Sequence, residues 1–209
     1  MGQGIEKQRR PGRKALMCLG VVVPVLTGIA LMPFGASGGA PAAPHDHSAH
    51  DHPAVDAEMG SELAQVRRAT ARFHNVDNAL AAGYELGWVN GSGARILGGC
   101  VAHPTAGAMG YHYFNAALMA DNGVDALAPE VLVYAPDGDG GLELVAVEWV
   151  VRSAQSNPPG VSTAPSVLGM DMHILVPPPG PAFYLTHAWV WAHNPAGMFA
   201  DWNPEVSCS

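Results

Sequence analysis

Residues 130–151 read EVLVYAPDGDGGLELVAVEWVV. Two runs rich in valine and leucine, residues 130–135 and 142–151, flank the glycine-rich segment PDGDGG. Strand-like runs on either side of such a turn predict a β-hairpin. Alternate side chains of a strand share a face, and in the second run that face would carry Leu142, Leu144, Ala146, Glu148 and Val150. Because an unpaired buried charge is costly, Glu148 needs a partner and is the first candidate for a functional residue.

A third strand-like run, residues 183–192, leads into the sequence HAWVWAH at residues 187–193. If the alternation of a strand continues through it, one face carries His187, Trp189, Trp191 and His193. His193 stands immediately before an Asn-Pro pair, where a strand should end. His187 is therefore the stronger candidate of the two histidines.

Apolar residues recur at helical spacing from Leu63 to Leu80, with Ser61 placed as an N-cap and Gly83 as a stop. This pattern predicts an amphipathic helix over residues 61–82. Together with the strand-like runs it predicts an α+β fold, in which an N-terminal helix packs on a mainly antiparallel, curved sheet. Residues 61–209 are expected to form this single domain.

Residues 1–40 have the layout of a secretory signal peptide. Five basic residues lie in the first 14 positions, an uncharged apolar run follows at residues 15–34, and small residues at 35–40 suit a signal peptidase. The protein is therefore predicted to be secreted or otherwise extracytoplasmic. An uncleaved anchor is the alternative, since about 20 apolar residues suffice to span a bilayer. It is the one membrane contact that the sequence indicates.

Residues 41–60 consist largely of Ala, Pro, Asp and His and cannot form a core, which predicts a disordered linker. This histidine-rich segment contains His45, His47, His50 and His52. Imidazoles and carboxylates spaced so closely can share a divalent transition metal ion. The alternative is a solvated spacer whose histidines only change its charge with pH.

The charge of the predicted exported part excludes some partners. From residue 41 onward there are 17 acidic residues against five arginines and no lysine, a net charge of −12 with neutral histidines. An acidic surface repels phosphate backbones, so nucleic acid is excluded as a partner, and a cation or a small molecule is favoured. The sequence does not indicate an oligomeric state.

Cysteine usage agrees with an oxidising compartment. Beyond the signal segment the cysteines are Cys100 and Cys208. A pair in an exported chain most simply forms one disulfide.

Four motifs carry a resemblance: MGYHY at residues 109–113, PEVLVY at 129–134, LVAVEW at 144–149, and HAWVW followed by NPAGMFADWNP within 187–204. With them the chain resembles a group of uncharacterised exported bacterial proteins for which no activity is established. The resemblance spans residues 61–208 and implies a shared domain. It implies no mechanism.

The leading functional hypothesis is a divalent transition metal of the Zn, Cu or Fe class, bound through His and Glu side chains in the folded domain. Such sites need three or four converging donors, mostly imidazole with one or two carboxylates. The candidate ligands are His112, Glu148, His173 and His187, with His103 and His193 in reserve. The alternative is a buried hydrogen-bonded pair of Glu148 with one histidine, the others lying at the surface.

Two further hypotheses stay open. Trp149, Trp189 and Trp191 offer flat surfaces on which a carbohydrate or another small molecule could stack, with nearby carboxylates to bind or process it. The other is a purely structural exported domain. The sequence names no reaction, because no nucleophile elbow, phosphate-binding loop or dinucleotide fingerprint is present.

Overall fold

The computed structural model describes residues 53–175 and 182–208, which belong to one compact unit. The predicted hairpin is its centre: β6 (Val131–Pro136) pairs with β7 (Leu142–Arg152). The seven-stranded sheet has the order β1-β5-β6-β7-β11-β10, with β4 also paired to β5, and every pairing is antiparallel. The other strands of this sheet are β1 (Tyr84–Leu86), β4 (Cys100–His103), β5 (Gly107–Asn115), β10 (His173–Leu175) and β11 (Phe183–Ala188).

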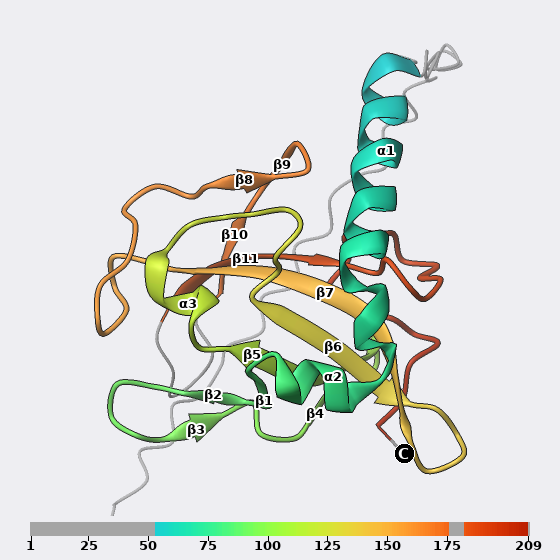
Figure 1. Cartoon of the computed structure of the whole chain (residues 1–209), viewed down its shortest axis with the longest axis horizontal. Helices are drawn as coiled ribbons and strands as arrows, with labels where there is room; N and C mark the ends of the chain where they lie inside the picture. Colours follow the sequence, from blue (N-terminus) through green and yellow to red (C-terminus); the bar gives the residue numbers. More distant parts are fainter. Residues whose placement is uncertain (1–52, 176–181, 209) are drawn as a thin grey trace, which may run out of the picture. The chain divides into compact units, whose positions relative to one another are not determined.

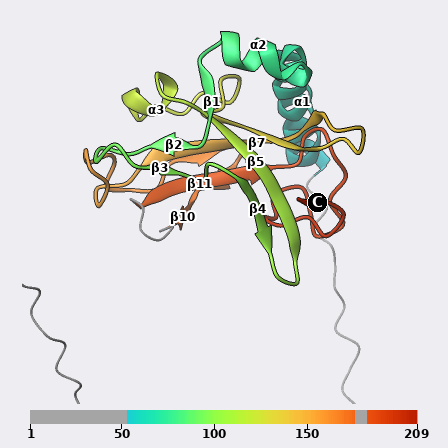
Figure 2. The ribbon, with the colours of Figure 1, turned by 90° about the horizontal axis from the view of Figure 1, so that it is seen from below.

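Two small two-stranded sheets lie outside this path. They pair β2 (Trp88–Val89) with β3 (Arg95–Ile96), and β8 (Ser166–Val167) with β9 (Met170–Asp171). The main sheet is strongly twisted, since β4 and β5 run steeply across the direction of β11 (Figure 2). The predicted fold class, a helix on a mainly antiparallel sheet with one disulfide, is confirmed (Figure 1).

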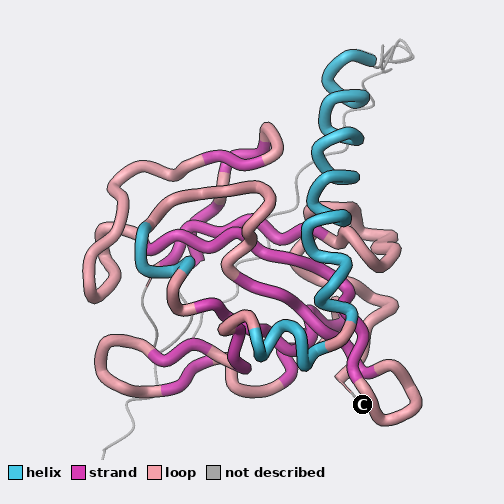
Figure 3. Tube along the Cα trace, viewed as in Figure 1, coloured by secondary structure: helices cyan, strands magenta, loops and turns pink. Residues whose placement is uncertain are grey.

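The predicted helix over residues 61–82 is in fact three helical pieces. They are α1 (Pro53–Thr70), the 3-10 helix η1 (Ala71–His74) and α2 (Val76–Ala81). The break falls at Asn75, whose backbone is extended and whose side chain accepts a hydrogen bond from the Asp77 amide at 2.9 Å. Asparagine in this role is a preferred N-cap, so it begins a new helix. A last short helix, α3 (Leu118–Asp121), follows β5 (Figure 3).

The helix also begins earlier than predicted. Residues 53–60, which we assigned to the disordered linker, are the first part of α1. Proline is well tolerated at the first helical position, where its missing N–H costs no hydrogen bond. The predicted signal peptide and His45, His47, His50 and His52 lie outside the described residues.

The two faces of the sheet carry two separate cores. Leu132 and Tyr134 of β6 point to the face covered by α1, η1 and α2, which we call the helix face. There the Tyr134 hydroxyl donates to the Phe73 carbonyl at 2.6 Å. Val131 and Val133 point to the opposite face, which we call the site face. The strict alternation follows from the period of two of a strand.

A bulge in β7 shifts the pattern that the sequence predicts. Val133 pairs with Ala146 but Tyr134 pairs with Leu144, so Val145 is the extra residue. Leu144 therefore belongs to the helix face, while Val145 and Ala146 both pack on the site face. The prediction that Leu142 and Leu144 share a face with Glu148 is wrong, because one inserted residue reverses the alternation before it.

A second bulge shapes the start of β5. Val101 pairs with Gly110 and Ala102 with Ala108, which leaves Met109 unpaired. Gly110 has φ +117°, and a Cβ there would lie 2.3 Å from the Tyr134 carbonyl oxygen. Glycine is therefore required, and the local kink turns Met109 to the same side as His112.

Residues 189–208 fold back across the start of β5. Asn203 and Ala108 exchange two backbone hydrogen bonds of 3.1 Å, and Cys208 forms the predicted disulfide with Cys100 of β4. The Cα atoms of the bridge are 5.7 Å apart. The described residues include no helix that is both long enough and apolar enough to cross a membrane.

Candidate metal centre

Strands β5, β7 and β11 bring three side chains together on the site face: His112, Glu148 and His187. Glu148 of β7 lies directly opposite His187 of β11 in the strand register, and His187 Nδ1 is 2.9 Å from Glu148 Oε1. His112 comes from β5, and its Nε2 lies 3.5 Å from the same oxygen. One potential ligand atom from each residue lies within 4.8 Å of the others.

His112 and Glu148 meet although β6 separates their strands. Two strand spacings amount to about 9.6 Å, so both side chains must lean over the strand between them. Val133 pairs with His112 and Val131 with Glu148, and both valines are small and fully buried beneath the two side chains. The small β6 residues leave room for the contact.

The spacing of these atoms suits a metal ion. Bonds of about 2.1 Å to a tetrahedral ion place two ligand atoms about 3.4 Å apart. The observed separations from Glu148 Oε1, 2.9 Å to His187 and 3.5 Å to His112, bracket that value. An ion held between the three atoms would replace the proton that His187 shares with the carboxylate.

The three side chains are almost fully buried, with exposed fractions of 2% for His112, 3% for Glu148 and 0% for His187. Burial alone would raise the pKa of Glu148, but the charge of His112 and the hydrogen bonds from His112 and His187 outweigh it. They hold the pKa of the Glu148 carboxyl well below its usual range. Glu148 is therefore a carboxylate, the form that binds cations.

Each histidine keeps a second, unpaired ring nitrogen. His112 Nδ1 and His187 Nε2 are buried and have no hydrogen-bond partner among the described residues. Buried polar groups are nearly always satisfied in proteins, and an exception calls for an ion, a water or a functional role. The alternative of one buried Glu–His pair with the other histidines at the surface describes His187 with Glu148, and it fails at His112, which is also buried beside Glu148.

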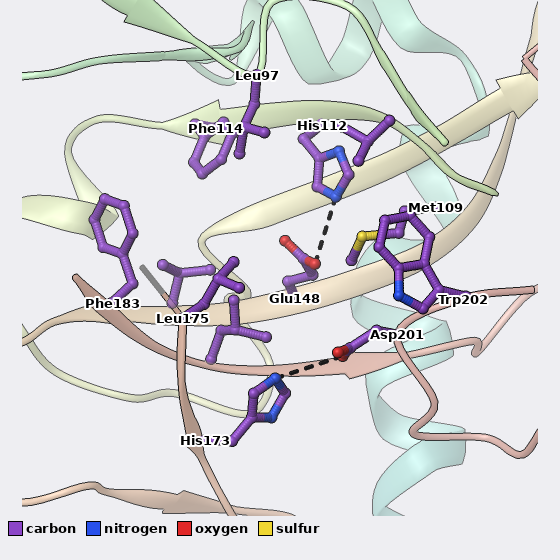
Figure 4. A pocket seen from close by; sticks show the side chains of 13 residues that line it. Leu97, Met109, His112, Phe114, Glu148, His173, Leu175, Phe183, Asp201 and Trp202 are labelled. Atoms are coloured by element: carbon purple, nitrogen blue, oxygen red, sulfur yellow. Dashed lines mark ion pairs between the residues drawn. The ribbon is translucent and has the colours of Figure 1, made fainter. Parts of the chain in front are cut away.

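His112 and Glu148 also line a cavity of about 310 Å³. Figure 4 shows both side chains at its wall, with Phe114 and Leu97 beside His112. The remaining lining residues are Val101, Met109, Val150, His173, Leu175, Phe183, Leu185, Asp201 and Trp202. His187 is not among them, and it contacts Glu148 from the neighbouring strand β11.

The other predicted ligands lie away from the cluster. His173 of β10 is half-exposed at the cavity, where its Nε2 is 3.5 Å from Asp201 Oδ1 (Figure 4). His103 is exposed, and its Nδ1 accepts from the amides of Thr105 and Ala106. His193 is exposed and pairs with Glu205 at 3.3 Å. None of the three joins His112, Glu148 and His187.

The predicted stacking residues are tied into the fold. Trp149 and Trp189 are fully buried, and their indole N–H groups donate to the carbonyls of Asp125 and Ala200. Trp191 lies on the helix face and donates to the Thr70 hydroxyl at 3.1 Å. None of them lines the cavity of the described residues, where the indole is that of Trp202.

Several cavity residues were missed in the sequence although a signal was present. Phe114, Val150 and Leu185 each stand two positions from a cluster residue on the same strand. Period two alone places them beside His112, Glu148 and His187. Met109 stands three positions before His112, and only the bulge at β5 brings it to the cavity.

Comparison with known proteins adds no family or fold relative: no protein-family model, curated protein or solved structure matches the chain. Membership of the exported bacterial group stays a prediction. The arrangement of the site is thus the basis for assigning a function.

Proposed function

We propose that this chain is an exported protein that binds one divalent transition metal ion through His112, Glu148 and His187. The observation that carries the proposal is the convergence of two imidazoles and one ionised carboxylate in a buried cluster. The ligand atoms face one another: His187 Nδ1 and His112 Nε2 lie 2.9 Å and 3.5 Å from Glu148 Oε1, separations that suit coordination of one shared ion.

The donor set indicates the class of metal. Two nitrogens and one carboxylate oxygen suit Zn, Cu or non-haem Fe better than Ca or Mg, which prefer oxygen ligands. Three protein ligands leave a position open, as in binding and catalytic sites, and His112 and Glu148 face the cavity. A metal there would act as a Lewis acid toward a molecule in the cavity.

Two independent observations support export of the protein. The Cys100–Cys208 disulfide is typical of proteins in oxidising, extracytoplasmic compartments. Residues 1–40 have the charge and hydropathy pattern of a signal peptide.

Elemental analysis tests the metal site directly. The protein should be purified as the full chain without a histidine tag, with His45, His47, His50 and His52 replaced by alanine. Replacement is better than truncation near residue 61, because α1 begins at Pro53. We expect one transition metal ion per chain after dialysis. No stoichiometric metal in this protein would overturn the proposal.

Point variants locate the site. His112→Ala and His187→Ala should each lower the metal affinity about tenfold or more, so that the metal content after dialysis falls clearly below that of the unsubstituted site. His193→Ala is the matched control, because this histidine is exposed and lies outside the cluster. Circular dichroism shows whether each variant is folded, and Glu148→Gln serves as a near-isosteric replacement if the alanine variants unfold.

The cavity favours a second, compatible function, the binding of a small molecule. Its lining is mostly apolar and carries few polar groups, which is typical of small-molecule sites. A carbohydrate fits poorly, since its hydroxyls need many hydrogen-bonding side chains and the predicted stacking residues lie elsewhere.

A further inference from the structure

The cavity has a polar end and an apolar body. Its polar end is formed by His112 and Glu148, which are almost fully buried. Phe114, Val150, Phe183 and Leu185 are buried as well and make apolar walls around it. A molecule that fills this space must therefore be apolar over most of its surface.

The volume sets the size of that molecule. An apolar protein cavity of about 150 Å³ holds one benzene ring. The cavity here measures about 310 Å³, about twice as much, and so has room for two fused rings with a small head group.

The charge at the polar end sets the head group. Histidines that bind a metal ion are neutral, so a divalent ion held by two imidazoles and one carboxylate leaves a net charge of +1 on the occupied cluster. In a site of such low exposure an uncompensated charge is costly. One anionic, metal-binding head group would neutralise it and fill the open coordination position.

Among the described residues, the lining of the cavity contains no lysine or arginine that could hold an anionic group at the mouth. His173 and Leu175 are its exposed lining residues, and His173 lies 3.5 Å from the Asp201 carboxylate. Asp201 is the one acidic side chain of the described chain that lines this part of the cavity, and it disfavours a second negative charge there. The anionic head of a ligand is thus directed inward, toward the metal, and its apolar body fills the space behind it.

We infer that the cavity binds a small, mainly apolar molecule of about two fused rings, whose single anionic head group coordinates the metal held by His112, Glu148 and His187. The inference rests on the proposed metal site. It adds the chemical class of the ligand and the direction in which the ligand enters.

Three probes separate the contributions that the apolar rings and the metal-binding head group make to the affinity of the ligand. They are 2-naphthohydroxamic acid, which has both, 2-naphthamide, which has the same rings without the metal-binding head, and acetohydroxamic acid, which has the head without the rings. Isothermal titration of the zinc-loaded full chain should show 2-naphthohydroxamic acid binding about tenfold or more tightly than 2-naphthamide. Acetohydroxamic acid should bind about a hundredfold or more weakly than 2-naphthohydroxamic acid, because it buries no ring.

A pair of neighbouring residues tests the location. Val101 lines the cavity, whereas Ala102, the next residue of β4, is exposed and does not. Val101→Trp should weaken both naphthyl probes about tenfold or more by filling the space, with the zinc content unchanged. Ala102→Trp should change neither affinity. Equal effects of the two variants would overturn the inference.

The outcomes distinguish this inference from the proposed function. If the chain holds one zinc ion but binds the two naphthyl probes equally, or binds neither, the ligand inference fails and the metal site stands. If the chain holds no metal, both fail. Removing zinc with EDTA should abolish the difference between the naphthyl probes and leave the binding of 2-naphthamide in place.

Discussion

Glu130 and Glu148 are the buried carboxylates of the described residues. They differ in the groups that surround them, which are acidic for Glu130 and imidazoles for Glu148. Glu148 has two imidazoles beside it. Glu130 has no cationic partner: its Oε2 accepts from the Val150 amide at 2.9 Å, and Asp121 and Asp125 add negative charge nearby. Burial is the largest effect and raises the pKa of Glu130 to about 7.

The Glu130→Gln variant tests this environment. The folded pKa of about 7 lies above the ordinary value of 4.5, so the stabilisation due to the protonated carboxyl is complete below pH 4.5 and is lost as the pH rises through 7. Glutamine keeps the oxygen for Val150 and never ionises. Relative to the wild type, the variant should therefore gain about 3 kcal/mol of unfolding free energy between pH 4 and pH 8.

Urea denaturation of both proteins across that range measures this difference. The difference in unfolding free energy between the two proteins at each pH removes the contributions of the other titrating groups, which both proteins share. Parallel stability profiles would contradict the assignment of a raised pKa to Glu130.

At the level of single residues, the sequence was sufficient to predict that Glu148 is buried and has a partner. A carboxylate inside an apolar strand is visible without a structure, and so is the need for a partner. The sequence could not choose between His112, His173 and His187. That choice depends on which strands become neighbours, and the order β5-β6-β7-β11 brings two of them to Glu148 and leaves His173 on β10.

At the level of elements, the hairpin of β6 and β7 was predicted closely because its turn and its apolar runs are local features. The bulge at Val145 was not, since nothing in the sequence LELVAVEW marks an extra residue in the ladder. Similarly, β11 ends at Ala188, after which Trp191 turns to the helix face and contacts the His74 ring. Trp189 stays on the site face, with its ring 4.7 Å from that of His187, so the expected single face is wrong at Trp191.

The kink in β5 leads to a prediction about Gly110. Gly110→Ala would force an alanine into φ +117° with its Cβ 2.3 Å from a backbone oxygen of β6. The protein should lose about 3 kcal/mol or more of unfolding free energy. Met109 and His112 should also shift, which lowers metal affinity.

Gly138→Ala is the matched control. Gly138 also has a positive φ, +83°, but a Cβ there would meet nothing within 4 Å. Its loss of unfolding free energy should stay at about 1–2 kcal/mol, the cost of a left-handed backbone conformation for a residue with a Cβ. Urea midpoints of the two variants give the comparison, and an equal loss would show that the contact with Tyr134 is relieved without cost.

At the level of the whole molecule, the disulfide joins residues 108 positions apart, Cys100 and Cys208. It fastens residues 189–208, and with them Asp201 and Trp202, to the edge of the sheet. In the chain-entropy account, closing a loop of this length stabilises the fold by about 4–5 kcal/mol. The pairing was predictable because these are the cysteines beyond the apolar segment, although its role as a cavity wall was not.

The double variant Cys100→Ser with Cys208→Ser should lose about that 4–5 kcal/mol in urea denaturation. Its metal content should be unchanged, because His112, Glu148 and His187 lie on strands that the bridge does not hold. Binding of 2-naphthohydroxamic acid should weaken as the wall formed by Trp202 loosens. Loss of the metal with the disulfide, in a protein that is still folded, would contradict this separation.

Trp202 and Cys208 follow β11 in the chain, so they are synthesised after all three residues of the candidate metal site. During synthesis, His112, Glu148 and His187 are all present before the cavity wall has been made. The three strands can therefore pair before that side is closed, and the proposed metal ion would have access to the cluster at that stage. Until an oxidant joins the two thiols, the segment that carries Trp202 is held at this edge by noncovalent contacts such as the Ala108–Asn203 hydrogen bonds, so a reduced chain is expected to open its cavity more readily on this side.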